Sequence, residues 1–399
     1  MAVQVLDKIT WVGKVDWEIR RFHGEEYSTH RGSTYNSYLV RDDKTALIDT
    51  VWAPFEKAFV ADLKKEIDLQ KIDYVIANHG EKDHSGALAA LMRQIPETPV
   101  YCTQNAVKSL KGQYHCDWNF KTVKTGDKLS LGKKDLVFIE APMLHWPDSM
   151  FSYLTGDNVL FSNDAFGQHL ATELLFNDLV DPAELGQESI KYYANILTPF
   201  SLLVEKKIQE VLAMKVSVDM ICPSHGVIWR KDPLKIVNQY LEWAKDYQED
   251  QVTIVYDTMW DGTRRMAEAI ARGIMAENSH LVVKLFNIAR SDKNDVVTEV
   301  FKSKALLMGS PTINKRILSS VGGFLEEIRG LGFKNKKAAA FGCYGWSGEG
   351  IKIISAALKN CGFELMNDGL RTTWNPDEQA VAQCLSFGRQ VGSNIANNI

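Results

Sequence analysis

The segment "NHGEKDHSG" (residues 78–86) lies between two apolar runs, "IDYVIA" before it and "ALAALM" after it. Apolar runs on both sides of a short polar loop predict two buried elements joined at the end of a strand. The loop carries two histidines and two acids, His79, Glu81, Asp83 and His84. Charged loops are usually solvated turns, so the rest of the chain must decide between a turn and a metal site.

Three further segments end an apolar run with a metal-competent side chain beside glycine or proline. They are "EAPMLHWPDSM" with His145, "LFSNDAFGQH" with Asp164 and "ICPSHGVIW" with His225. Strand ends are where α/β sheets place their sites. A single histidine in such a place is more often structural. Seven such side chains in one half of the chain, however, predict a binuclear metal site.

Composition bounds the class of protein. The chain has 399 residues, of which 45% are hydrophobic and 24% charged, and this length predicts two domains. The net charge of −4 gives no basic face for nucleic acid. No apolar run reaches the roughly 18 residues that span a bilayer, and "MAVQVLDKITWVG" lacks a signal peptide's apolar core. We expect a cytoplasmic protein with no nucleic-acid or membrane partner.

The six cysteines are scattered, and no two form a C-x-x-C pair. This spacing argues against disulfides and against a cysteine-ligated iron–sulfur or rubredoxin-type site. Each cysteine has apolar neighbours, which predicts small buried side chains. They are Cys102, Cys116, Cys222, Cys343, Cys361 and Cys384.

The two halves of the chain differ in their pattern of elements. Up to about residue 230, short strands alternate with turns and helices, including a long helical run from about 182, which predicts an α/β sandwich. An amphipathic helix over 232–247 marks a boundary. From residue 252 onward, five strands alternate with helices, which predicts a doubly wound parallel sheet. We therefore expect domains at 1–250 and 251–399.

The second half opens with a strand and "YDTMWDGTRRMAEAIARG" (residues 256–273). Thr258, Gly262 and Thr263 at the start of a helix are typical of a phosphate cradle, although such residues also cap helices for structural reasons. The loops "GSPTINKR" and "GCYGWSGEG" follow later strands, at the edge where such sheets bind ligands. Trp346 is suited to lie against a flat ring, with burial in the core as the alternative.

Two resemblances follow from these motifs. The first half resembles the metallo-β-lactamase fold family, whose H-x-H-x-D-H motif reads here as His79-x-Glu81-x-Asp83-His84. The carboxylate of Glu81 in place of an imidazole makes the ligand set harder, which suits iron better than zinc. Asp164, with two carboxylate oxygens, is the natural bridge between two metals.

The second half resembles flavodoxin, which binds FMN. It departs from the usual T-x-T-G-x-T loop, and the absence of G-x-G-x-x-G argues against a dinucleotide. The residues expected to contact FMN are Thr258, Met259, Trp260, Asp261, Gly262, Thr263, Ser310, Pro311, Thr312, Asn314, Tyr344, Gly345, Trp346, Ser347 and Gly348.

Together the halves resemble the flavodiiron proteins, also called A-type flavoproteins or rubredoxin:oxygen oxidoreductases. The most specific pieces are "HGEKDH", "MLHWPDSMF", "NDAFGQ", "SHGVIWRKDP", "YDTMW", "GSPT" and "YGWSGE". The resemblance implies two iron ions. His79, Glu81, His145 and Asp164 would hold one, and Asp83, Asp164 and His225 the other. His84 would either ligate the second iron or leave that position to water.

The same resemblance implies reduction of dioxygen to water, of nitric oxide to nitrous oxide, or of both, with electrons supplied through FMN. His23 and Tyr193 are similar to pocket residues of the family, with surface or packing roles as the alternative. The sequence shows no cysteine pairs near its C-terminal end, so we expect a separate electron carrier such as rubredoxin. The family also implies a head-to-tail homodimer, to which Trp243 and Tyr247 would contribute if they are exposed.

Two other classes of function stay open. One is a zinc-dependent hydrolase of the metallo-β-lactamase fold with a regulatory flavodoxin-like domain, against which Glu81 and the flavin loops argue. The other is an electron carrier or redox sensor with a structural metal pair. Flavin absorbance with iron analysis discriminates the first, and oxygen consumption with reduced rubredoxin discriminates the second.

Overall fold

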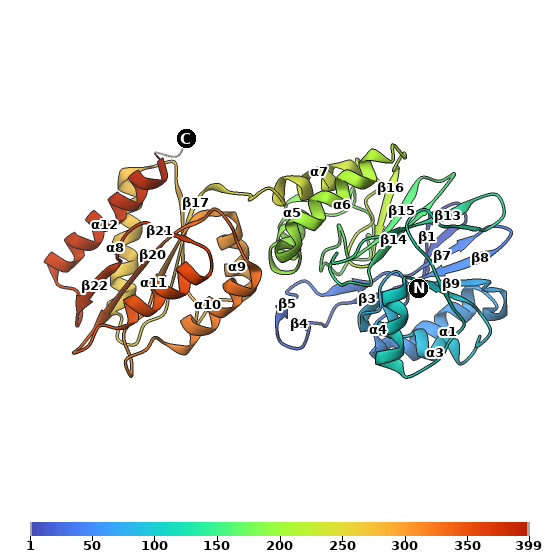
Figure 1. Ribbon diagram of the computed structural model, residues 1–399, viewed down its shortest axis with the longest axis horizontal. Helices are drawn as coiled ribbons and strands as arrows, with labels where there is room; N and C mark the ends of the chain where they lie inside the picture. Colours follow the sequence, from blue (N-terminus) through green and yellow to red (C-terminus); the bar gives the residue numbers. More distant parts are fainter. Residues whose placement is uncertain (1, 397–399) are drawn as a thin grey trace. The chain divides into compact units, whose positions relative to one another are not determined.

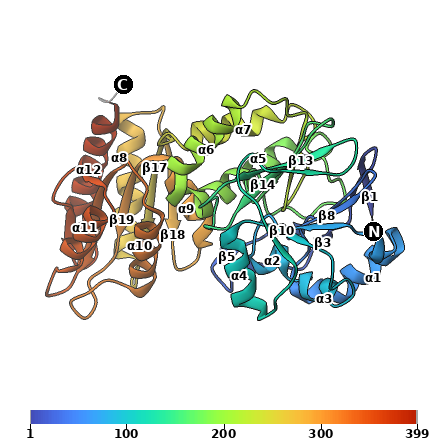
Figure 2. The same cartoon turned by 45° about the vertical axis from the view of Figure 1, so that its right-hand side comes forward.

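The computed structural model describes residues 2–396, and the chain forms two compact units (Figures 1 and 2). The first unit contains the residues up to Tyr193 together with Phe200–Leu241. The second contains Ala194–Pro199 and the chain from Glu242 onward. A short segment of the N-terminal half therefore belongs to the second unit.

Local contacts explain this division. The side-chain amide of Asn195 donates hydrogen bonds to the carbonyl of Asn294 and to the hydroxyl of Thr298, both on helix α9 (Lys293–Lys302). Ahead of the second sheet, the ring of Tyr247 stacks on Phe301, with ring centroids 5.9 Å apart. The second unit therefore begins its packing before its first strand.

The first unit is an α/β sandwich of two sheets with helices on both outer faces (Figure 1). The larger sheet has the order β1-β2-β7-β8-β9-β10-β11. Its strands are Val3–Leu6, Ile9–Trp11, Tyr38–Arg41, Thr45–Ile48, Tyr74–Ile76, Val100–Cys102 and Phe120–Thr122. Helices α1 (Glu56–Glu66), α3 (Leu88–Met92) and α4 (Gln104–Tyr114) lie beside it.

The second sheet of this unit has the order β12-β13-β14-β15-β16. Its strands are Lys128–Ser130, Asp135–Glu140, Met150–Leu154, Val159–Asn163 and Met220–Pro223, and α5 (Pro182–Tyr192), α6 (Ser201–Ala213) and α7 (Leu234–Trp243) lie beside it. Two small hairpins, β3–β6 (Lys14–Asp16, Ser33–Tyr35) and β4–β5 (Arg21–Phe22, Tyr27–Ser28), complete the unit.

The core of the first unit lies between its two sheets. Ile9, Trp11 and Tyr38 from the larger sheet belong to one buried cluster with Phe138 and Phe161 from the smaller sheet. Side chains alternate across each strand, so every second residue of a strand points into the layer between the sheets. The polar loops that follow the strands lie outside this layer.

The long helix expected from about residue 182 is interrupted. Helix α5 ends at Tyr192, a π-helical turn spans Tyr193–Leu197, a 3₁₀ turn spans Thr198–Phe200, and α6 follows. Pro199 lies in this break, where it lacks the N–H that a continuous helix needs and restricts the residue before it. The prediction of one continuous helical run is wrong for this reason.

The second unit is a doubly wound parallel sheet with the order β18-β17-β19-β20-β21, and β22 also pairs with β20. Its strands are Val282–Asn287, Glu249–Tyr256, Ser303–Gly309, Lys337–Tyr344, Glu364–Leu365 and Leu370–Thr373. Helices α8 (Gly262–Glu277) and α12 (Glu378–Ala396) pack together on one face, and α9, α10 (Ser319–Leu331) and α11 (Gly350–Asn360) lie on the other (Figures 1 and 2). The predicted fold class is confirmed.

Glycine sets the distance between α8 and α12. A Cβ on Gly273 would lie 2.2 Å from the carbonyl oxygen of Leu385 and 3.0 Å from the Cα of Gly388. The two helices therefore approach backbone to backbone, as small residues at a helix contact allow.

All six cysteines are free thiols. Four are buried as expected, whereas Cys116 and Cys343 are only half-buried, the latter because it lies near the open carboxyl end of β20. Among residues 2–396 no helix is both long and apolar enough to cross a membrane.

Candidate metal centre and flavin-binding loops

Four of the predicted ligands form one group. His79 and Glu81 follow β9, His145 follows β13, and Asp164 follows β15. One ligand atom from each lies within 4.8 Å of the others. The Glu81 Oε2 atom is 3.2 Å from His79 Nε2 and 3.3 Å from His145 Nε2. The four side chains therefore converge on a space that suits one metal ion.

The other three predicted ligands form a second group. Asp83 and His84 lie on the short helix α2 (Lys82–Ser85), and His225 follows β16. The Asp83 Oδ2 atom is 2.9 Å from His225 Nε2 and 3.1 Å from His84 Nε2. His84 thus lies inside the second group, with its ring directed at the same space.

The carboxylate of Asp164 lies between the two groups. Its Oδ2 atom is 3.6 Å from His79 Nε2 and 3.5 Å from His145 Nε2. Its Oδ1 atom is 3.0 Å from His84 Nε2 and 3.6 Å from His225 Nε2. One oxygen faces each group, which is the geometry of a carboxylate that bridges two metals.

Several polar atoms at this centre are buried without a hydrogen-bond partner. They are Asp83 Oδ1, Asp164 Oδ2 and His84 Nδ1. Leaving such atoms unpaired costs roughly 1–3 kcal/mol each, more for charged groups. Bound cations would satisfy them. The set of three carboxylates and four imidazoles fits a pair of hard metal ions.

The electrostatics of the centre also favour cations. Burial opposes protonation of His79 and His84, but nearby carboxylates raise the pKa of His79 well above its ordinary value and that of His84 to about 9. Burial likewise opposes ionisation of Glu81 and Asp164, yet the surrounding histidines hold the pKa of both carboxyls well below their usual range. The field that favours imidazolium ions would equally favour metal ions.

Two oxygen acceptors orient the ligand histidines from behind. His79 Nδ1 lies 2.7 Å from Asp148 Oδ1, and His225 Nδ1 lies 2.6 Å from the carbonyl oxygen of Thr34. Each contact leaves Nε2 directed toward the centre, as outer partners of metal-binding histidines do. A Cβ on Gly80 would lie 2.7 Å from Asp148 Oδ2, so this position needs glycine.

The two predicted pocket residues lie in different surroundings. His23 Nε2 is 3.3 Å from Glu81 Oε1; burial opposes its protonation, but the hydrogen bond to Glu81 raises the pKa of its imidazole. Tyr193 instead has its hydroxyl 3.0 Å from that of Ser201. Its neighbour Tyr192 donates a hydrogen bond of 3.1 Å to Asp164 Oδ1.

Three residues at the centre escape the sequence reasoning: Asp148, Tyr192 and His169. His169 is fully buried, and its Nδ1 is 2.8 Å from the Ser33 hydroxyl. A signal for Tyr192 does exist, because Leu185, Ser189 and Tyr192 recur at helical spacing and are all buried. Asp148 and His169 have no comparable signal in the sequence, because only the contacts of the folded chain bring these two side chains to the centre.

The phosphate-cradle prediction places Gly262 and Thr263 at the first turn of α8, and the structure has them there. A Cβ on Gly262 would lie 2.9 Å from Cys343 Sγ and 3.0 Å from Asn375 Oδ1, so the loops meet closely around this turn. The hydroxyl oxygen of Thr258 is buried without a hydrogen-bond partner. These features fit an anion at the N-terminus of the helix.

Met259, Trp260 and Asp261 lie in the loop between β17 and α8, and the other predicted flavin residues lie at or after the ends of β19 and β20, at the carboxyl edge of the sheet. The Thr312 N–H donates to the Cys343 carbonyl (3.0 Å), which ties the two loops together. Tyr344 is the last residue of β20, and the residues in the loops are Ser310, Pro311, Thr312, Asn314, Gly345, Trp346, Ser347 and Gly348.

Large aromatic side chains are exposed beside these loops. Trp346 is 89% exposed, Trp260 83% and Trp374 65%. The ring centroids of Trp346 and Trp374 are 6.3 Å apart. The alternative of a core role for Trp346 is therefore wrong. Trp374, which the sequence reasoning did not select, follows β22 and packs over Gly345.

Comparison with known proteins matches both halves. Residues 34–226 match the family described as ODP family beta lactamase, and residues 254–388 match flavodoxin. The solved rubredoxin oxygen:oxidoreductase from Desulfovibrio gigas is 36% identical with a TM-score of 0.96, over 100% of this chain and 99% of that one. The flavodiiron protein from Giardia intestinalis is 33% identical with a TM-score of 0.94, over 100% and 97%.

Curated relatives are closer in sequence. The anaerobic nitric oxide reductase flavorubredoxin of Escherichia coli O1:K1 / APEC is 55% identical over 99% of this chain and 83% of that protein. The chain belongs to the flavodiiron protein family. The protein of the same name from Vibrio vulnificus (strain YJ016) is also 55% identical, over 98% and 79%. This flavodiiron protein is therefore an oxidoreductase, and the zinc-dependent hydrolase alternative is set aside.

Proposed function

We propose that this flavodiiron protein reduces nitric oxide to nitrous oxide at a pair of non-haem iron ions. The reaction consumes two molecules of nitric oxide, two electrons and two protons and yields nitrous oxide and water. The observation that carries the proposal is the position of Asp164, whose two oxygens face two separate groups of ligands. The site can therefore hold two metals that share one carboxylate.

The ligand assignment follows the two groups. His79, Glu81, His145 and Asp164 would hold one iron, and Asp83, Asp164 and His225 the other, with His84 placed to join the second set. When bound, the irons would supply redox chemistry and an open position for a diatomic molecule. Two further side chains are placed to hold protons next to that position: His23, which contacts Glu81, and Tyr192, which donates a hydrogen bond to Asp164.

Reduction of dioxygen to water, which consumes four electrons and four protons, is the second candidate. The name of the solved Desulfovibrio gigas relative supports it, whereas the names of the more similar curated relatives support nitric oxide. We place nitric oxide first because 55% identity over nearly the whole chain exceeds the 36% shared with the oxygen reductase.

The diiron domain, expected at 1–250, is the first unit, and the FMN domain, expected at 251–399, is the second unit, which also contains Ala194–Pro199 and the chain from Glu242. FMN occupies the loops after β17, β19 and β20, and a rubredoxin-type carrier supplies the electrons, as the names of the relatives suggest. A head-to-tail homodimer pairs the FMN of one chain with the diiron site of the other. Six free thiols support a cytoplasmic location.

Trp243 and Tyr247, the two aromatics that the sequence suggested for the homodimer contact, are not available for it. Trp243 is buried and Tyr247 stacks on Phe301, so both pack within the chain. The exposed tryptophans beside the flavin loops, Trp260, Trp346 and Trp374, are better candidates for a contact.

Metal analysis with one matched pair of variants tests the proposal. Protein purified without oxygen should hold about two irons per chain, and it should turn over nitric oxide with reduced rubredoxin. His79→Ala should lose turnover and metal while keeping the flavin spectrum. His280→Ala, at an exposed histidine, should keep both. Zinc in place of iron with full activity would contradict the assignment, as would wild-type turnover of neither gas.

A further inference from the structure

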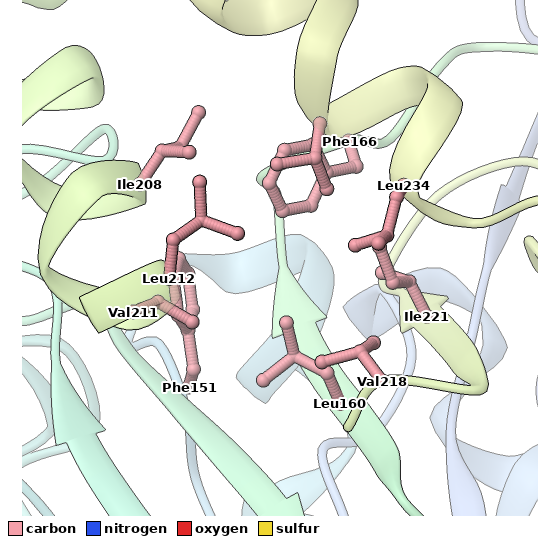
Figure 3. A pocket seen from close by; sticks show the side chains of 10 residues that line it. Phe151, Leu160, Phe166, Ile208, Val211, Leu212, Val218, Ile221 and Leu234 are labelled. Atoms are coloured by element: carbon pink, nitrogen blue, oxygen red, sulfur yellow. The ribbon is translucent and has the colours of Figure 1, made fainter. Parts of the chain in front are cut away.

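An apolar pocket opens on the first unit between α6, α7 and the strands β14–β16 (Figure 3). Its volume is ≈ 30 Å³, and all ten side chains that line it are apolar. Figure 3 shows side chains from both helices and from the strands below them directed into one space. No function assigned so far uses this pocket.

The pocket runs from the surface into the interior. Leu212 at the end of α6 and Leu234 at the start of α7 are 46% and 47% exposed and form its rim. Phe166 and Ile221 are 3% and 0% exposed and form its inner wall.

One residue of the inner wall, Phe166, lies on the short turn that carries Asp164. Phe166 follows Asp164 by two residues, and its backbone is held at a positive φ of 67°. Its N–H donates to the Tyr240 hydroxyl (3.1 Å), and its carbonyl accepts from Trp229 Nε1 (2.8 Å). A bulky residue held in this conformation is strained and persists only where the surroundings impose it. The ring of Phe166 is therefore fixed where the pocket meets the turn that carries Asp164.

Size and polarity select the occupant. A water molecule needs about 10–15 Å³ and two to four polar partners, and the apolar side chains here offer it none. The volume is too small for a peptide or a cofactor, because sites for drug-sized ligands measure roughly 300–1,000 Å³. Nitric oxide and dioxygen are small and weakly polar, so they partition from water into such a space.

We propose that this pocket binds the diatomic substrate on its way to the metal centre. The inference rests on the proposed function, because that function supplies the gas. The pocket raises the local concentration of gas beside Phe166, which lies two positions along the chain from Asp164, and leaves the polar ligand loops free for protons.

Xenon tests the pocket independently of turnover. Crystals of the full chain pressurised with xenon should show a peak between Phe166, Leu160 and Ile221. Val218→Phe adds a ring at the half-buried side of the pocket and should abolish the peak. Leu212→Phe, on α6, provides a second filling variant in case the first does not fold. Leu203→Phe, at an exposed leucine of the same helix that does not line the pocket, is the matched control and should keep the peak.

Rapid mixing with nitric oxide then tests the role. In the filled variants the second-order rate constant for nitric oxide binding to the reduced protein should fall by about fivefold, with metal and flavin content unchanged. Leu203→Phe should match the wild type. Absence of xenon from the wild-type pocket overturns the proposal, and so does an unchanged rate constant in both filled variants. If the wild type reduces neither gas, the proposed function fails, whereas wild-type turnover with unchanged variants removes only the pocket.

Discussion

Asp148 Oδ1 lies 2.7 Å from His79 Nδ1, and both side chains are completely buried. The contact fixes the tautomer and the plane of the His79 ring, so that Nε2 points at Glu81 and Asp164. Burial disfavours a charge on Asp148, but the hydrogen bond from His79 keeps the pKa of this carboxyl below its usual range. Asp148 therefore acts on the metal centre only through the histidine that it orients.

Replacing Asp148 with Asn tests this role. The amide keeps the shape of the carboxylate but lowers the basicity of the ring, so the affinity for metal should fall about 10–100-fold. Competition with a chelator measures this affinity, and flavin absorbance reports the fold of the other unit. Asp117→Asn, at an exposed carboxylate, is the control. Equal metal affinity in Asp148→Asn and wild type would show that the contact does not tune the site.

The exposed tryptophans allow a second prediction. Trp346→Ala should raise the dissociation constant of FMN by roughly two- to tenfold, because an aromatic face contributes about 0.5–1.5 kcal/mol beyond area and excludes water from the ring. Trp374→Ala should have a smaller effect of the same sign, since Trp374 contacts Trp346. Fluorescence titration of the FMN-free protein gives both constants. Trp17→Ala, at an exposed tryptophan of the other unit, should change neither affinity nor midpoint potential. Unchanged values in Trp346→Ala would remove this residue from the flavin site.

Lys336 allows a prediction about pH. Its ammonium group is buried, donates to the carbonyls of Phe301 and Ser303, and burial lowers its pKa from 10.5 to about 7. Below pH 7 the amine is charged in the folded and unfolded chain, and the full burial penalty applies. Above pH 7 the folded chain holds a neutral amine while the unfolded chain still binds the proton, so stability rises with pH.

The difference in free energy of unfolding between Lys336→Met and the wild type should therefore be largest below pH 7, with the variant the more stable of the two. It should fall by about 1.4 kcal/mol per pH unit from there toward pH 10. Urea unfolding at several pH values measures this difference. Lys359→Met, at an exposed lysine, should show no such slope. A difference that does not change with pH would mean that the buried amine keeps its charge throughout.

The convergence of the seven candidate ligands was predictable from the sequence because these side chains lie close to strand ends, where α/β folds bring polar groups together. Glu81 in the first loop also carries chemical information of its own. Tyr192 and Tyr193 show what the sequence does not determine. They are adjacent in the chain, and only the geometry at the end of α5 decides which of the two rings faces Asp164. Asp148 and Thr34 act through contacts between segments far apart in the chain, and single-sequence patterns do not report such contacts.

The division of the chain was less predictable than the folds. The segment Ala194–Pro199 follows a helix of the first unit yet packs with the second, through hydrogen bonds of Asn195. Periodicity reports which face of an element is buried but not against which partner it packs. The apolar pocket likewise depends on how side chains from α6, α7 and the sheet pack together, so no sequence motif predicts it.

The last prediction concerns the homodimer. Electron transfer falls steeply with distance, so the FMN must lie near the metal centre that it serves. In a crossed arrangement that centre belongs to the partner chain, and a two-fold contact is the commonest way in which identical chains pair. Complementation discriminates the two cases. His79→Ala removes the metal centre but keeps the flavin, and Thr263→Asp places a negative charge in the phosphate cradle and removes the flavin.

The two variants are dissociated, mixed in equal amounts and allowed to form dimers again. With random pairing, half of the dimers contain both chains, and each of these has one intact flavin serving one intact metal centre. The mixture should therefore regain about a quarter of the wild-type activity. A mixture of His79→Ala with His225→Ala should stay inactive, because no chain then carries an intact metal centre. If mixed dimers form and the first mixture also stays inactive, electrons pass within each chain and the crossed arrangement is wrong.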